Sequence, residues 1–112
     1  MIVDDLERVR EGLRTMLELA DDLECMGEAA NGLQAIQLAE QLEPDVVLMD
    51  VRMPAMDGLD ATRLIKNRWP GVKIILLTIY GAYRKEALAA GADAFVSKAD
   101  PPERLLEAIA KR

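Results

Sequence analysis

The chain contains no histidine, only one cysteine, and no apolar run approaching the roughly 18 residues that a membrane-spanning helix needs. The absence of histidine excludes Ser-His-Asp and Cys-His catalysis, zinc bound by imidazole, and an internal phosphohistidine. A single cysteine, Cys25, cannot form an intramolecular disulfide, and the N-terminus has no signal-peptide pattern. These features are typical of a reducing compartment, so we expect a cytoplasmic protein without a membrane segment.

The sequence also lacks a cluster of lysine or arginine residues. Its 20 acidic and 14 basic residues give a formal net charge of −6. Because nucleic acid binding depends on cations that neutralise phosphates, we expect no direct nucleic acid binding by this chain. The length of 112 residues, with 51% hydrophobic and 30% charged residues, is typical of one globular domain with a real core.

Short apolar segments alternate with amphipathic ones, without a linker or repeat. The expected strands are Met1–Val3, Leu23–Ala30, Val46–Met49, Val72–Thr78 and Asp93–Ser97. The expected helices run from Leu6 to Ala20, from Asn31 to Pro44, from Asp57 to Pro70, from Tyr83 to Ala90, and from Asp100 onward. Five strand–helix units predict an α/β fold, with a doubly wound five-stranded parallel sheet of order 2-1-3-4-5 flanked by five helices.

Two helix starts carry specific expectations. Asn31 and Gln34 have the spacing of a capping box. Asp100 is expected to be the N-cap of the last helix, with Pro101 at its first position and Glu103 three residues after the cap. On that helix, Leu105, Leu106 and Ile109 are expected to face the core.

Acidic side chains follow the two strands that flank the expected ligand site. In the 2-1-3-4-5 order, ligands bind beyond the carboxyl ends of strands one and three. Strand one is followed by Asp4 and Asp5, and strand three by Asp50. Thr78 and Lys98 end the fourth and fifth strands, so the fold brings all five residues to one edge of the sheet.

Each of these residues has a simpler explanation when taken alone: an aspartate can cap the next helix, as Asp5 can here, a threonine favours strands, and a lysine can be a solvated charge. Together they do not. Two carboxylates about 4 Å apart repel by about 4 kcal/mol at a protein-like dielectric, so three of them require a cation. Carboxylate oxygens that leave room for water suit Mg²⁺, and an added lysine and hydroxyl complete a phosphoryl-transfer site.

Rival sites on such a fold lack their motifs. The segment DDLERVREG after strand one would repel the phosphate of a flavin mononucleotide, and neither GxxxxGK[ST] nor GxGxxG occurs. Phosphatases of the haloacid-dehalogenase type carry a second aspartate two residues after the nucleophile, where this chain has Arg52. We therefore expect no multiple-turnover enzyme.

At these residues the sequence resembles the receiver domain of two-component response regulators, which has a flavodoxin-like (CheY-like) fold. The resemblance covers residues 1–112 and rests on VDD at 3–5, DVVLMDVRMPAMDG at 45–58, ILLT at 75–78 and GADAFVSK at 91–98. The pieces VREGLRTMLE and LLTIYGAYRKEALAAGADAFVSK resemble the NarL/FixJ-type branch more narrowly.

The resemblance implies that Asp50 accepts a phosphoryl group from a phosphohistidine on a sensor histidine kinase. It implies that Asp5, Asp50 and the main-chain carbonyl of Arg52 bind Mg²⁺ directly, and that Asp4 acts through water. Lys98 would pair with the phosphoryl oxygens, and the Thr78 hydroxyl would donate a hydrogen bond to one of them.

Further implied roles are less specific. Phe95 would turn inward as Thr78 moves and remodel the surface of the fourth helix, fifth strand and fifth helix. An aromatic on a short strand more often simply fills the core, and only the resemblance favours the switch role. Arg52 and Tyr80 would influence the lifetime of the phosphoryl group, and exposure in loops is the alternative. A phosphate-independent interaction or dimerisation module is the alternative for the whole domain.

Four departures from the family pattern affect these expectations. The first strand is short, which leaves a trimmed start or a frayed sheet edge open. Ala99 follows Lys98 where many receivers have proline, so we expect no cis bond there. Phe95 lacks a hydroxyl, so its switching would depend on packing. We expect no output domain within these 112 residues. Members of this branch usually continue into a helix-turn-helix domain, so DNA binding and transcriptional control would lie there. A receiver cut from such a regulator and a stand-alone receiver both remain open, as does homodimerisation.

Overall fold

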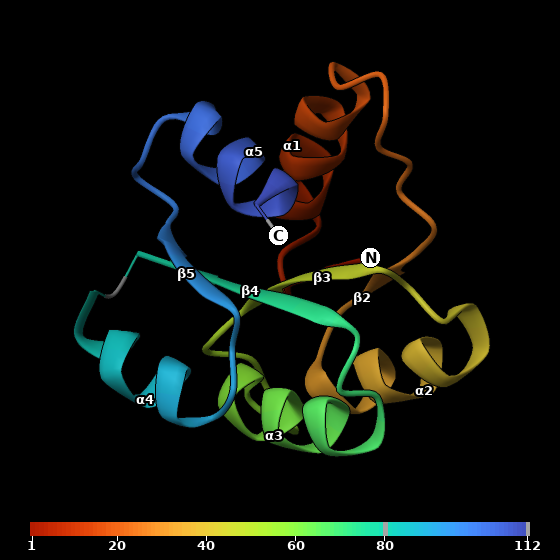
Figure 1. The fold of residues 1–112 in the computed structure, drawn as a ribbon, viewed down its shortest axis with the longest axis vertical. Coiled ribbons are helices and arrows are strands. Elements are labelled where there is room, and N and C mark those ends of the chain that lie inside the picture. The colour runs from red at the N-terminus through yellow and green to blue at the C-terminus, as the bar shows by residue number, and fades with distance from the viewer. Residues whose placement is uncertain (80, 112) are drawn as a thin grey trace.

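The computed structural model describes residues 1–79 and 81–111, and its centre is a five-stranded parallel sheet (Figure 1). The strands are β1 (Ile2–Val3), β2 (Glu28–Ala29), β3 (Val46–Asp50), β4 (Lys73–Thr78) and β5 (Ala94–Ser97). The helices are α1 (Glu7–Glu18), α2 (Gly32–Leu42), α3 (Gly58–Arg68), α4 (Arg84–Ala89) and α5 (Pro102–Ala110), with a 3₁₀ turn at Gly81–Tyr83. The strand order is β2-β1-β3-β4-β5, which confirms the expected α/β fold and order 2-1-3-4-5.

Helices cover both faces of the sheet: α1 and α5 lie on one face, and α2, α3 and α4 lie on the other (Figure 1). Successive side chains of a strand point to opposite faces, so each strand supplies both layers. Val47 and Met49 of β3 join the core beneath α2 and α3, whereas Leu48 joins the core beneath α1 and α5. This two-sided burial explains why the strands are almost continuously apolar.

The first two strands are shorter than the others. β1 has two residues, and Ile2 and Val3 pair with Glu28 and Ala29 on one side and with Leu48 and Met49 on the other. The expected strand Leu23–Ala30 is therefore too long, because β1 offers only two residues for β2 to pair with. The fourth helix is also shorter than expected, since residues 81–83 form the 3₁₀ turn.

Of the two helix starts with specific predictions, the one at Asn31 is confirmed as the N-cap of α2. The Asn31 side chain accepts a hydrogen bond from the Gln34 N–H at 2.9 Å, which is one half of the expected capping box. The Gln34 side chain accepts its hydrogen bond from the Ala30 N–H at 2.8 Å, one residue before the N-cap. Asp57 caps α3 in the same way, through the Asp60 N–H at 2.8 Å.

The expectation for Asp100 is wrong. The N-cap of α5 is Pro101, and Pro102 occupies the first helical position. The Asp100 carboxylate instead accepts a hydrogen bond from the Ser97 N–H at 3.3 Å, so it closes the turn that follows β5. On α5, Leu105 is buried and Leu106 and Ile109 pack against the same core, as expected. Among the described residues no peptide bond is cis, in agreement with the prediction for Ala99.

Within residues 1–79 and 81–111, no helix combines the length and the apolar character needed to span a membrane.

Candidate functional site

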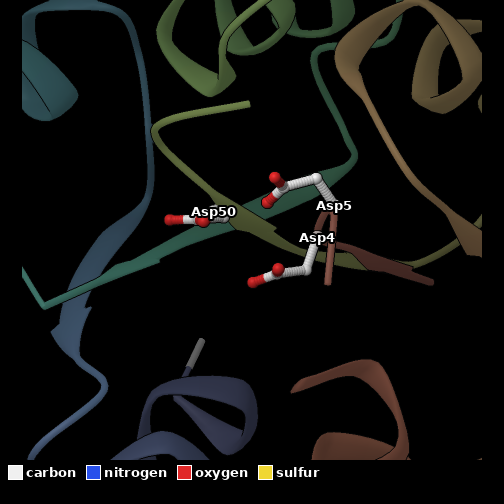
Figure 2. Close-up of side chains that lie close together, drawn as sticks. All are labelled: Asp4, Asp5 and Asp50. Atoms are coloured by element: carbon white, nitrogen blue, oxygen red, sulfur yellow. The ribbon is translucent and has the colours of Figure 1, made fainter. Parts of the chain in front are cut away.

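Three carboxylates lie together at the carboxyl ends of β1 and β3. Asp4 and Asp5 follow β1, and Asp50 is the last residue of β3. Each offers one oxygen, and these oxygens all lie within 4.8 Å of one another. Figure 2 shows the three side chains directed to the same side of the strand ends. The pairing of β1 with β3, the central strand, brings these residues together across more than 40 positions of sequence.

Asp50 is fixed by contacts with the neighbouring strand and with the chain that follows it. It pairs with Leu77 of β4, its residue is 9% exposed, and its Oδ1 accepts a hydrogen bond from the Val51 N–H at 2.8 Å. Behind it, Gly58 at the start of α3 donates its N–H to the Val51 carbonyl at 2.7 Å. A Cβ on Gly58 would overlap the main-chain oxygen of Asp50. The absence of a side chain at this position is what lets α3 begin so close to β3.

Asp4 and Asp5 differ in their exposure. Asp4 is 1% exposed, and its Oδ1 accepts a hydrogen bond from the Leu6 N–H at 3.0 Å. Asp5 is exposed and leaves the site open to solvent. The alternative role of Asp5 as a helix cap is not observed, because Leu6 precedes α1 and no side chain caps that helix.

Lys98 supplies the positive charge of the site. Its Nζ lies 2.7 Å from Oδ2 of Asp4 and 3.3 Å from Oδ2 of Asp50. The Lys98 N–H donates to the Thr78 carbonyl at 3.0 Å, which fixes the end of β5 beside the end of β4. Thr78 is buried at that edge. The structure therefore brings Asp4, Asp5, Asp50, Thr78 and Lys98 to one edge, as the strand order predicted.

The charges in this site shift two pKa values. Burial raises the pKa of Asp50 above its usual value, and the charge of Asp4 adds to this effect, while Lys98 opposes it. Burial acts to lower the pKa of Lys98, but its hydrogen bond to Asp4 and the charge of Asp50 outweigh burial and raise it. Lys98 is thus firmly cationic, and the net environment of Asp50 disfavours its negative charge.

This donor set fits a hard divalent cation. Lys98 compensates only part of the negative charge of three carboxylates, and the exposed Asp5 provides an approach from solvent. An open cleft of about 420 Å³ adjoins Asp5 and is lined also by Val51, Arg52, Met53, Pro54, Asp57, Leu59 and Tyr83. Oxygen donors beside a cleft that is open to solvent are typical of a site for Mg²⁺, which keeps several of its waters.

The remaining predicted site residues lie around this centre. Arg52 is exposed, follows Asp50 by two residues and lines the cleft beside Asp5. Phe95 of β5 is half-buried and packs against the core beneath α2, α3 and α4, so its present position is that of a core residue. Tyr80 lies outside the described residues.

Two contacts of Asp4 were missed at the sequence level. One is its ion pair with Lys98, which joins residues 94 positions apart. The other is a hydrogen bond from Nη1 of Arg10 to the Asp4 carbonyl at 2.7 Å. A signal for Arg10 exists in the sequence: with Leu13 and Leu17 it has the 10, 13, 17 spacing of one helix face, so it points toward the sheet.

Comparison with known proteins gives a consistent result. Residues 1–110 match the family described as the response regulator receiver domain. The transcriptional regulatory protein LnrK of Bacillus subtilis is 40% identical over 111 residues, which cover 97% of this chain and 50% of LnrK. The chain therefore spans about half the length of the curated relatives it matches.

Solved structures agree with the sequence relatives. A two-component response regulator of the LuxR family from Aurantimonas superposes with a TM-score of 0.93 at 35% identity, covering 97% of this chain and 79% of that one. A DNA-binding response regulator of the LuxR family from Staphylococcus aureus gives 0.89 at 32% identity, covering 96% of this chain and 92% of that one.

Proposed function

The chain belongs to the response regulator receiver domain family of two-component systems, and we propose that it is a phosphorylation-activated switch whose phosphoacceptor is Asp50. One observation carries this proposal: the buried carboxylate of Asp50 lies among Asp4, Asp5 and Lys98 at the open edge of the sheet. No simple structural role requires three carboxylates and a lysine at one point.

The phosphodonor is a phosphohistidine on a sensor histidine kinase. A carboxylate oxygen of Asp50 attacks the phosphorus, the bond from phosphorus to the imidazole nitrogen breaks, and that nitrogen leaves with the electron pair and takes up a proton. The product is an acyl phosphate on Asp50. Lys98, which already lies 3.3 Å from the Asp50 carboxylate, balances the charge of the phosphoryl oxygens, and the Thr78 hydroxyl donates a hydrogen bond to one of them.

Mg²⁺ is the proposed cofactor. Asp5, Asp50 and the main-chain carbonyl of Arg52 would hold it directly, and Asp4 would act through water. When bound, the metal neutralises charge on the transferring phosphoryl group. Arg52 and Tyr80 are the proposed modulators of how quickly water removes the phosphoryl group. The domain performs its own phosphorylation and dephosphorylation without being a multiple-turnover enzyme.

The output is proposed to be transcriptional. The relatives are named as transcriptional regulators and as DNA-binding response regulators, and this chain corresponds to about half of the curated ones. We therefore propose that DNA binding belongs to an output domain outside these 112 residues. We propose that phosphorylation changes the surface formed by α4, β5 and α5, and that this change transmits the signal. Thr78 and Phe95 are the proposed switch residues, and the domain is a candidate for homodimerisation.

Labelling with acetyl phosphate tests the phosphoacceptor. With Mg²⁺ present, the wild type should gain one phosphoryl group that hydroxylamine removes, and chelation of Mg²⁺ should abolish labelling. Asp50→Ala should remove the adduct, whereas Asp45→Ala, at the exposed opposite end of β3, should keep it. If the wild type takes up no phosphoryl group, the proposal is refuted in favour of a phosphate-independent interaction module. Repeated turnover of small phosphate esters would instead indicate a phosphatase.

A further inference from the structure

The Asp4–Asp5 peptide is held by a side chain outside the carboxylate cluster. The ladder between β1 and its neighbours ends at Val3, so the carbonyl of Asp4 is the first one beyond the sheet. Nη1 of Arg10 donates to this oxygen at 2.7 Å. Because the peptide is planar, the direction of the Asp4 carbonyl also fixes the direction in which the chain enters Asp5.

Arg10 is itself held in place by a contact with β2. Its Nε donates to Oε1 of Glu28 in β2 at 3.1 Å, and Arg14 pairs with the other oxygen of Glu28. The Arg10 side chain is only 17% exposed. A guanidinium has donors in a rigid planar fork, so one side chain can grip a carboxylate and a carbonyl together. Arg10 thus ties α1 and β2 to the peptide between the two aspartates.

We propose that Arg10 is a positioning residue for the metal site: it orients the Asp4–Asp5 peptide so that the carboxylate of Asp5 is presented toward Asp50. The inference rests on the proposed Mg²⁺-dependent function. Groups that orient metal ligands without touching the metal commonly affect metal affinity by about tenfold or more.

The sign of the effect separates positioning from simple electrostatics. Arg10 is a cation beside an anionic site, so removing its charge should strengthen the binding of another cation. Loss of the hydrogen bond to the Asp4 carbonyl should instead weaken binding, because Asp5 would sample directions that do not face Asp50. A purely structural role would lower the stability of the fold and leave the Mg²⁺ affinity of the folded protein unchanged.

Isothermal titration calorimetry with MgCl₂, without a phosphodonor, measures this directly. The wild type is titrated first, and then Arg10→Met, Arg10→Lys and Arg14→Met. Arg14→Met is the matched control, because Arg14 is also a cation of α1 that pairs with Glu28, through Oε2. We expect Arg10→Met to raise the Mg²⁺ dissociation constant about tenfold, while Arg14→Met leaves it unchanged or lowers it slightly.

Arg10→Lys retains the charge but cannot reproduce the fork, so its dissociation constant should rise as well. It also serves as the deciding variant if Arg10→Met does not fold, as judged by circular dichroism. Unchanged or tighter binding in the folded Arg10 variants would overturn the positioning role. A wild type that binds no Mg²⁺ would instead overturn the metal site proposed above, so the two failures can be told apart.

Discussion

Replacing Gly58 with alanine should destabilise the domain strongly, because no space exists for one methyl group at the start of α3. A Cβ there would overlap the Asp50 carbonyl oxygen and would lie 3.0 Å from both the Asp50 carbonyl carbon and the Val51 Cα. All three atoms are main chain, so no flexible side chain can move away. β3 is paired on both sides, by β1 and β4, and cannot retreat as a unit.

The expected loss is about 3 kcal/mol of unfolding free energy, at the upper end of the range for an extra methyl group in a packed core. Gly12→Ala is the matched control. Gly12 lies within α1, and a Cβ there would meet nothing within 4 Å, so alanine should stabilise by about 0.5–1 kcal/mol through its higher helix propensity. The same chemical change is thus expected to act in opposite directions at two helical positions.

Urea denaturation followed by circular dichroism and by the fluorescence of Trp69 measures both variants. With a slope of about 1.5 kcal/mol per M, the midpoint of Gly58→Ala should fall by about 2 M, and that of Gly12→Ala should rise by about 0.5 M. Gly58→Ala should also be labelled poorly by acetyl phosphate, because the overlap displaces the main chain of Asp50, the proposed phosphoacceptor. A Gly58→Ala protein as stable as the wild type would refute the argument from close packing.

Three further predictions concern the charges of the site. Mg²⁺ at ten times its dissociation constant should stabilise the wild type by about 1.4 kcal/mol. Asp5→Asn should reduce this gain and should also stabilise the metal-free protein, and thermal melts in Mg²⁺ or in chelator measure both effects. A melting temperature that millimolar Mg²⁺ leaves unchanged would contradict the metal site. Because burial raises the pKa of Asp50, its ionised form disfavours folding at neutral pH, so Asp50→Asn should be more stable than the wild type at pH 7 in the presence of chelator. This difference in stability should vanish as the pH falls below 3.8, the ordinary pKa of an aspartate, where both states of the wild type are protonated. Urea titrations that give the same difference at every pH would refute it. Lys98→Met should destabilise the metal-free protein by about 3 kcal/mol, because it leaves the buried Asp4 carboxylate without its cation. Lys85→Met on the exposed face of α4 should be nearly neutral, and equal effects of the two substitutions in chemical denaturation would count against the ion pair.

The parts of the fold that were predictable are those dictated by local pattern and by parallel topology. Apolar runs located β3, β4 and β5 to within a residue or so at each end, because strands covered on both faces must be apolar along their length. The gathering of Asp4, Asp5 and Asp50 followed from strand order alone, since the carboxyl ends of parallel strands share one edge.

The errors arose where a partner far away in the sequence decides the outcome. The length of β2 is limited by the two residues that β1 offers, and nothing within residues 23–30 reveals that limit. Asp100 was expected to cap α5, but the turn after β5 uses its carboxylate instead. The ion pair of Lys98 with Asp4 depends on the closure of the sheet, and the role of Arg10 depends on where Glu28 lies.

The pairing of Asp4 with Lys98 also bears on how the domain is made. During synthesis β1 appears before β5, and the 94 positions that separate the two partners take roughly 5 to 20 s to translate at typical rates. Throughout that time the carboxylate of Asp4, which ends almost completely buried, lacks its lysine. A nascent chain therefore has an electrostatic reason not to close the sheet around Asp4 early, and the completed fold of this domain needs Lys98 at the end of β5.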